Sequence, residues 1–296
     1  MGRSSPMRLA VKFNLALLAA FAVGFVAAGF VSRTLLLRNA RDEVLDSSRM
    51  IMASAMASRN YTTNQVAPLL RRLPDEEFLP QTVPAFGATE QFAQLRAQFP
   101  DFSYKEATLN PTNLRDKATD WEVDVVNRFR QYPDQSEIVI ERDTPTGRSL
   151  SLAKPIKIKD PSCLGCHTTV DEAPKAMLRR YGPANGFGWQ LGDIIGAQIV
   201  SVPMALPIER AERAFYAFMA SMGGIFAVVF VLLNVMLTIM VVRKVTRLSR
   251  AADEVSMGKL DAPELPAGGK DELSRLAASF NRMKKSLAHA IKMLEE

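Results

Sequence analysis

The sequence predicts an α+β domain held between two membrane-spanning helices and followed by a pair of short helices. Two runs without a charged residue, at residues 14–31 and 214–242, indicate the spans. The second run exceeds the roughly 20 residues that cross a bilayer, and the first is close to the lower limit of about 17. Residues 32–213 between them suffice for one packed domain, and their patterns mix helical with strand-like periods.

Basic residues mark the outer flanks of both runs and predict how the chain is oriented. Three precede the first run and four follow the second: Arg3, Arg8, Lys12, Arg243, Lys244, Arg247 and Arg250. Lysine and arginine are enriched in cytoplasmic flanks. We therefore expect both termini, residues 1–13 and 243–296, in the cytoplasm, and residues 32–213 in the periplasm of a bacterial inner-membrane protein.

A cleaved signal peptide is the alternative interpretation of the first run, because Ala27-Ala28-Gly29 resembles a cleavage site. However, Val31 and residues 35–37 continue the apolar helical pattern beyond that site. This continuation favours an anchor that stays in the mature protein.

The first part of the outer domain is predicted as helix, loop and short helix. Residues 33–60 contain neither proline nor glycine, so we expect the first span to continue outward as one long helix. Several prolines between residues 80 and 111 predict a loop-rich stretch. A short amphipathic helix is predicted at residues 121–129, where Val123, Val126 and Phe129 share a face.

Strand patterns follow in the second part. Residues 138–140 and 150–158 are rich in apolar and β-branched residues and flank Thr144-Pro145-Thr146-Gly147, so they predict a hairpin. Residues 194–202 form an apolar run that predicts a buried strand leading to the second span. Together these patterns predict a small antiparallel sheet with accompanying helices.

The segment Cys163-Leu164-Gly165-Cys166-His167 contains both cysteines of the 296-residue chain. Two thiols at this spacing can form thioether bonds to the vinyl groups of a haem, and the histidine then ligates the iron. Zinc needs about four ligands, and the other histidine, His289, falls in the cytoplasmic segment. A redox dithiol needs no trailing histidine, and a disulfide would close too short a loop to stabilise much. The pentapeptide therefore predicts one covalent haem c on Cys163 and Cys166, with His167 as proximal iron ligand.

The chain resembles a bacterial family of c-type haem domains, long of unknown function, whose cyanobacterial member has a PAS-like fold. Three segments carry the resemblance: residues 104–113 (Tyr-Lys-Glu-Ala-Thr-Leu-Asn-Pro-Thr-Asn), residues 163–167, and residues 181–189 continuing through 196–203. It covers roughly residues 39–204 and implies a PAS-like domain with a single covalent haem. In the cyanobacterial member a cysteine is thought to be the sixth ligand, whereas this chain has no third cysteine.

Methionine is the usual partner of histidine in c-type sites. Met52 and Met56 share a face of the predicted entry helix, so Met52 is our first candidate for the distal ligand, with Met50 and Met56 as alternatives. Met177 and Met204 are further candidates. Two other interpretations stay open: these methionines fill the core, as methionines at helical spacing commonly do, or the distal position is open or holds water and admits a small gas.

The last segment shows heptads. Apolar residues recur at steps of three and four in two stretches: Val241, Val245, Leu248, Ala252 and Val255, then Leu273, Leu276, Phe280, Met283 and Leu287. Gly258-Lys259-Leu260 ends the first stretch, and prolines and glycines at residues 263–269 predict a connector. Two such helices bury their seams most simply as a parallel four-helix bundle in a homodimer. The arrangement resembles a HAMP linker over residues 241–287, with Lys244 where proline is usual; a plain coiled coil is the alternative.

The composition and the absence of recognisable catalytic motifs reduce the number of functions to consider. The net charge of +6 is largely explained by basic residues beside the membrane and gives no reason to expect nucleic acid as a partner. No catalytic constellation is recognisable, so we do not expect an enzyme. We expect a membrane-bound c-type haem sensor that detects redox state or a small diatomic gas and signals through a HAMP dimer to a separate cytoplasmic protein. The alternative is a membrane-anchored monohaem electron-transfer cytochrome with a redox partner; the HAMP-like segment favours the sensor, because a carrier needs no signal linker.

Overall fold

The computed structural model of the protein describes residues 9–73, 77–145, 147–259 and 261–295. The chain divides into two compact units, residues 33–214 and residues 1–32 together with 215–296. Of the residues used in the sequence argument, Arg3, Arg8, Thr146 and Leu260 lie outside the described residues.

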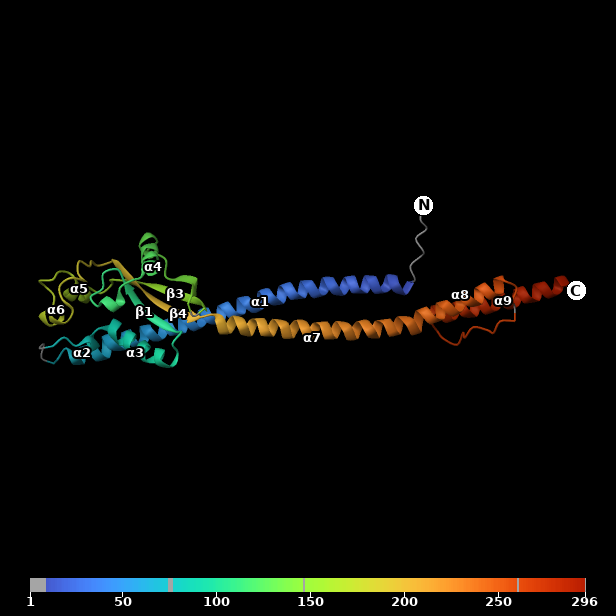
Figure 1. Ribbon diagram of the computed structural model, residues 1–296, viewed down its shortest axis with the longest axis horizontal. Helices are drawn as coiled ribbons and strands as arrows, with labels where there is room; N and C mark the ends of the chain where they lie inside the picture. Colours follow the sequence, from blue (N-terminus) through green and yellow to red (C-terminus); the bar gives the residue numbers. More distant parts are fainter. Residues whose placement is uncertain (1–8, 74–76, 146, 260, 296) are drawn as a thin grey trace. The chain divides into compact units, whose positions relative to one another are not determined.

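The unit of residues 33–214 is built on one antiparallel sheet. Its strands are β1 (Ser103–Thr108), β2 (Ile138–Thr144), β3 (Gly147–Lys157) and β4 (Ile194–Pro203), in the order β1-β4-β3-β2 (Figure 1). The predicted hairpin of β2 and β3 and the predicted buried strand β4 are confirmed. Residues 194–200 of β4 are all buried because the strand lies between β1 and β3 with both faces covered, which accounts for its continuous apolar sequence.

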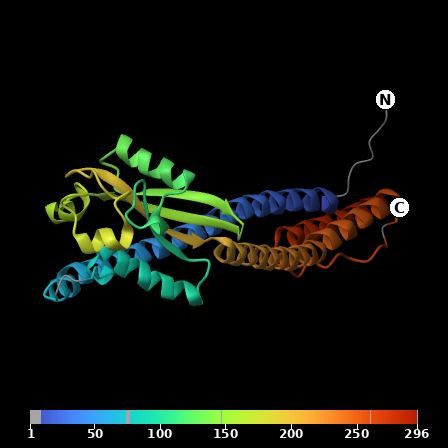
Figure 2. The ribbon, with the colours of Figure 1, turned by 60° about the vertical axis from the view of Figure 1, so that its left-hand side comes forward.

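Helices cover both faces of this sheet. Helices α1 (Leu9–Tyr61) and α3 (Pro84–Gln98) lie on one face, and α4 (Asp120–Gln131) lies on the other (Figures 1 and 2). The first face forms a core that includes Val44, Met52, Ala55, Ala88, Phe92, Tyr104, Leu150, Leu152 and Val200. The second face forms a core that includes Ala107, Val125, Val126, Phe129, Ile138, Ala153, Ala197 and Ile199. The predicted α+β domain, including the short helix near residues 121–129, is confirmed.

The prediction of a loop-rich stretch at residues 80–111 is wrong. Most of it is the helix α3 and the strand β1. Pro84 occupies the first turn of α3, where a missing backbone N–H costs nothing because that group has no partner within the helix. Strand β1 was missed because Lys105 and Glu106 break the apolar pattern that was used to recognise strands. Both charges find ionic partners in the fold.

Among the residues that the structure describes, two helices are long and apolar enough to cross a membrane, as predicted. One is α1, which continues through the π-helical turn η1 (Thr62–Val66) into α2 (Ala67–Leu70). The other is α7 (Ala205–Leu237), which continues through η5 (Thr238–Val242) into α8 (Arg243–Ser256). Within the unit that holds both spans, Phe21 stacks on Phe226 with ring centroids 4.8 Å apart, and Phe25 contacts the same ring.

The segment after the second span contains α8, a connector and α9 (Glu272–Glu295). The side-chain amide of Asn281 holds the connector, since it donates to the carbonyl of Leu265 and accepts from its N–H at 2.9 and 3.0 Å. Asp271 caps α9 by accepting from the N–H of Ser274 at 2.7 Å. The same carboxylate pairs with Lys244, the residue that stands where HAMP linkers usually have proline.

Candidate functional site

The two cysteines lie on one short helical turn that follows β3 in the sequence. The turn η4 (Pro161–Cys163) leads into α5 (Leu164–His167), and the side chain of Asp160 caps it by accepting from the N–H of Ser162 at 2.8 Å. Cys163 and Cys166 are three residues apart and therefore share a face, and both side chains are partly exposed. Burial, assisted by the charge of Asp160, raises the pKa of the Cys163 thiol, so the group is protonated at neutral pH.

His167 is held in one orientation by three neighbours. Its ring stacks on Trp189 with centroids 3.9 Å apart and an interplanar angle of 19°. Its Nδ1 atom lies 2.7 Å from the carbonyl oxygen of Gly186 and 3.4 Å from the hydroxyl of Thr112. Because a carbonyl can only accept, Nδ1 carries the proton and donates it to Gly186, which leaves the lone pair of Nε2 for a metal.

The ionisation of His167 suits the same role. Burial lowers the pKa of the imidazole, although the hydrogen bond to the Gly186 carbonyl opposes this shift. The ring is therefore neutral at physiological pH, which is the form of histidine that ligates metals. Two partly exposed thiols followed by a fixed neutral imidazole fit a haem that is bound through thioethers and ligated from one side.

Residues from all three segments singled out in the sequence meet at His167. Asn110 and Thr112 follow β1, Gly186 and Trp189 follow α6 (Lys175–Tyr181), and His167 ends α5. The Asn110 side chain accepts from the N–H of Gly186 at 3.2 Å, and Trp189 donates its backbone N–H to the carbonyl of His167 at 3.2 Å. The sequence placed Trp189 and Gly186 in a segment of the family resemblance without giving either residue a role.

A buried charge cluster lies at the end of α1, close to the cysteine-bearing turn. Arg59 pairs with both carboxylate oxygens of Glu106 on β1, and the Tyr104 hydroxyl donates to the same carboxylate at 2.8 Å. Burial alone would lower the pKa of Arg59, but the Glu106 carboxylate raises it. Burial and the adjacent Glu106 charge raise the pKa of Tyr104. The Arg59 charge opposes the rise in the pKa of the Cys163 thiol, so this cluster and Cys163 share one region of the domain.

The methionine candidates for a distal ligand occupy different environments. Met52 is fully buried in the first core, whereas Met50 is 69% exposed and Met56 is 37% exposed. Met177 and Met204 are buried as well. The burial of Met52 agrees with the alternative interpretation that its side chain fills the core. Met56 lies one helical turn before Arg59.

Two further polar residues, Lys105 on β1 and Asn113 in the loop after it, have structural partners. Lys105 donates to Glu122 at 2.7 Å and to the carbonyl of Lys117 at 2.8 Å, and Asn113 accepts from the N–H of Arg115 at 3.2 Å. These contacts stabilise the loop between β1 and α4.

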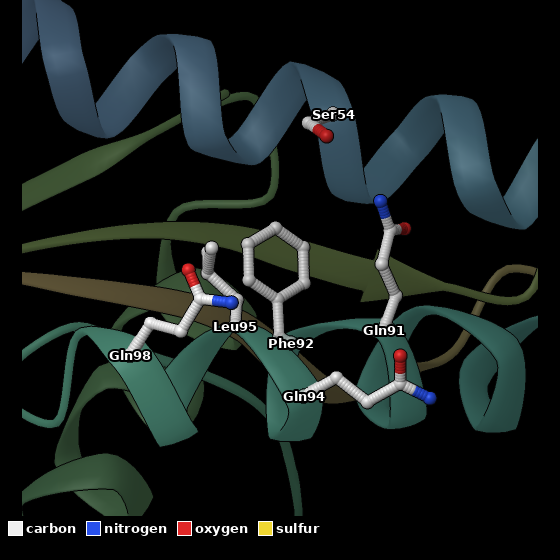
Figure 3. A pocket seen from close by; sticks show the side chains of 6 residues that line it. All are labelled: Ser54, Gln91, Phe92, Gln94, Leu95 and Gln98. Atoms are coloured by element: carbon white, nitrogen blue, oxygen red, sulfur yellow. The ribbon is translucent and has the colours of Figure 1, made fainter.

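A shallow groove lies elsewhere, between α1 and α3. Its volume is about 350 Å³, and Figure 3 shows Ser54 of α1 above a row of α3 side chains that includes three glutamines and Phe92. The lining residues are Ser54, Gln91, Phe92, Gln94, Leu95 and Gln98, so neither thiol and no imidazole faces it. The groove is therefore distinct from the site around His167.

Comparisons with known proteins identify families for two parts of the chain, the domain between the apolar helices and the segment after them. The family described as Tll0287-like matches residues 37–203, more than half of the sequence, and the HAMP domain matches residues 236–289. A search of curated proteins found no match. A solved structure, described as the cyanobacterial heme-protein Tll0287, aligns with a TM-score of 0.43 and 18% identity over 54% of this chain and 95% of that one. The chain is therefore a member of the Tll0287-like family, with a HAMP domain after its second apolar helix.

Proposed function

We propose that the protein is a membrane-bound c-type haem sensor that carries one haem on Cys163 and Cys166, with His167 as the proximal ligand. The observation that carries this proposal is the fixed imidazole beside two thiols on one helical turn, with Nδ1 donating to Gly186 and Nε2 left to bind. Cys163 and Cys166 would hold the haem by thioether bonds, each formed by adding a thiol S–H across one vinyl group without an oxidant. A bound haem supplies an iron that exchanges an electron or binds a small gas.

The HAMP segment supports a signalling role. Three residues of the predicted seam in α9 are largely uncovered within one chain: Leu276, Met283 and Leu287 are 51%, 56% and 42% exposed. A second copy would cover these residues in a parallel bundle, which is how short amphipathic helices with a heptad seam gain stability. We propose that this homodimer passes the signal to a separate cytoplasmic protein.

The orientation follows from the charges at the membrane. Lys12 lies before the first apolar segment, and Arg243, Lys244 and Arg247 lie after the second, so the flanks of both segments are basic. We propose that residues 32–213 face the periplasm of a bacterial inner membrane, where haem is attached to c-type proteins, and that both termini are cytoplasmic.

The stimulus depends on the far side of the iron. A methionine there, with Met52 as first candidate and Met50 or Met56 as alternatives, would favour the ferrous state and block gases, so the protein would respond to redox state. An open or water-bound position would admit a diatomic gas. Spectra of the ferrous protein with and without carbon monoxide separate these two versions of the proposal.

Haem attachment is tested on denaturing gels. The wild-type chain should retain haem-dependent peroxidase staining after denaturation, as should the Met50→Ala control. The double variant Cys163→Ala with Cys166→Ala should lose the stain. Wild-type haem that extracts into acidic organic solvent would contradict covalent attachment.

Sensing and electron transfer are distinguished at the HAMP domain. A cysteine introduced as Leu287→Cys, on the exposed seam, can be linked across a dimer by a bis-maleimide in membranes poised oxidised or reduced. The sensor proposal predicts linking yields that differ between the two poises, and that lose this difference in His167→Ala. Equal yields at both poises, together with rapid electron exchange, would favour the membrane-anchored electron-transfer cytochrome.

A further inference from the structure

Asn110, in the loop that follows β1, is hydrogen-bonded to Gly186, the residue whose carbonyl accepts a hydrogen bond from His167. Asn110 Oδ1 accepts from the N–H of Gly186 at 3.2 Å, and the carbonyl of the same Gly186 accepts from Nδ1 of His167 at 2.7 Å. Gly186 is buried, and its φ of +88° is a backbone conformation that favours glycine. The two hydrogen bonds therefore act on one backbone unit whose conformation is unusual and whose carbonyl direction matters.

Thr112 in the same loop packs directly on Gly186. A Cβ atom placed on Gly186 would lie 2.0 Å from the Thr112 hydroxyl oxygen and 3.0 Å from its Cα atom. No side chain fits in that space, so the loop and the glycine are in backbone contact. Trp189 stacks on the imidazole ring and covers one of its faces.

The strength of that hydrogen bond matters for a metal on Nε2. An imidazole that donates its Nδ1 proton to a well-placed carbonyl becomes a stronger electron donor through its other nitrogen. A stronger donor stabilises the ferric state more than the ferrous state and so lowers the midpoint potential. Any residue that fixes the Gly186 carbonyl thus acts on the iron without touching it.

We propose that Asn110 is a positioning residue for His167, and that by fixing Gly186 it sets the midpoint potential of the haem. This inference rests on the proposed haem attachment at Cys163 and Cys166. It assigns Asn110 a role that is separate from attachment, because its side chain contacts the Gly186 backbone and the thiols lie on the turn before His167.

The loop offers a matched control. Asn113 lies three residues later, and its Oδ1 atom also accepts from a backbone N–H at 3.2 Å, in this case from Arg115. Asn110→Ala and Asn113→Ala therefore delete the same side chain and the same kind of hydrogen bond, but only the first bond holds Gly186. The full-length variants are purified in detergent, and the midpoint potential is measured by spectroelectrochemical titration.

Asn110→Ala should raise the midpoint potential, with about a tenfold shift of the ferrous-to-ferric ratio, or about 59 mV for one electron. Asn113→Ala should stay within about twofold of the wild type. Asn110→Asp retains the acceptor oxygen and adds a negative charge, so its potential should not rise. Hydrogen exchange at the Gly186 amide, which needs no redox readout, should accelerate in Asn110→Ala and not in Asn113→Ala.

The outcomes separate this inference from the proposed function. Haem that stays covalently attached while Asn110→Ala and Asn113→Ala have equal potentials would overturn the role of Asn110 and leave haem attachment intact. A rise in potential in both alanine variants would also overturn it, because the effect would then be general to the loop. Absence of covalent haem from the wild type would overturn the proposed function and this inference together.

Discussion

The ion pair between Arg59 and Glu106 ties the end of α1 to the sheet, and its removal tests how strongly the two are joined. Glu106 is 4% exposed and accepts from both Arg59 and the Tyr104 hydroxyl. Glu106→Gln keeps the shape of the side chain but leaves the Arg59 cation without its counter-charge. Breaking a buried pair in this way costs about 3–5 kcal/mol. Since the Arg59 side chain is 22% exposed, we expect the lower end, about 3 kcal/mol.

A second ion pair from the same helix supplies the control. Arg49 of α1 pairs with Glu137 at 2.7 Å, but these side chains are 48% and 28% exposed. Glu137→Gln should therefore lower the free energy of unfolding far less than Glu106→Gln does. For a domain of this size each kcal/mol lowers Tm by about 2–4 °C, so Glu106→Gln should lower it by about 6–12 °C. Thermal unfolding of the full-length protein in detergent, followed by circular dichroism, measures both variants. Equal shifts in Tm would refute the argument that burial makes the Arg59 pair the stronger one.

Three further predictions concern pH, the methionines and topology. Burial, with a contribution from the Glu106 charge, raises the pKa of Asp116 to about 6 from an ordinary value of 3.8. Because the folded state then binds a proton that the unfolded state has lost, the free energy of unfolding should fall as pH rises from about 4 to 6. Urea titrations at each pH should show this fall in the wild type and a flatter dependence in Asp116→Asn. Met52→Ala should lower the free energy of unfolding by about 2–5 kcal/mol because Met52 is fully buried, whereas Met50→Ala should change it by less than about 0.5 kcal/mol. The ferric spectrum gives a second test, with Leu152→Ala as a core variant of equal stability. A change in the spectrum of Met52→Ala that is absent in Leu152→Ala would show that Met52 ligates the iron. Reporter domains that are active only outside the cytoplasm should work when fused after Asp160 and fail after Glu296, and the opposite result would refute the orientation.

Local sequence patterns predicted the strands that are marked by a continuous apolar run or by turn residues. The apolar run of β4 indicates a strand because both of its faces are buried, and the hairpin of β2 and β3 is indicated by its turn residues. Strand β1 could not be recognised in this way. Its inward-facing Glu106 is acceptable only because Arg59, 47 residues earlier in the chain, supplies the counter-charge. Such compensation depends on tertiary contacts and leaves no local signal.

In the candidate site, too, some residues could be recognised from local sequence and others only from tertiary contacts. The cysteines and His167 were predicted because the spacing of the pentapeptide is itself the requirement of thioether chemistry. The Gly186 carbonyl, the Asn110 amide and the Trp189 ring were not assigned roles, since they come from segments up to 79 residues apart and act through backbone groups and stacking. The helical period placed Met52 and Met56 on one face but did not reveal that Met52 is buried in the core and Met56 is partly exposed.

The mass of the intact, denatured protein shows whether haem is bound covalently to Cys163 and Cys166. The full-length chain is produced in cells that attach c-type haem, purified in detergent, unfolded in acid and measured by mass spectrometry beside the Cys163→Ala, Cys166→Ala double variant. We expect a wild-type mass that exceeds the mass of the chain by one haem, and a double-variant mass without this increment. A wild-type mass equal to that of the chain alone, from protein that carries haem before unfolding, would contradict covalent attachment at Cys163 and Cys166.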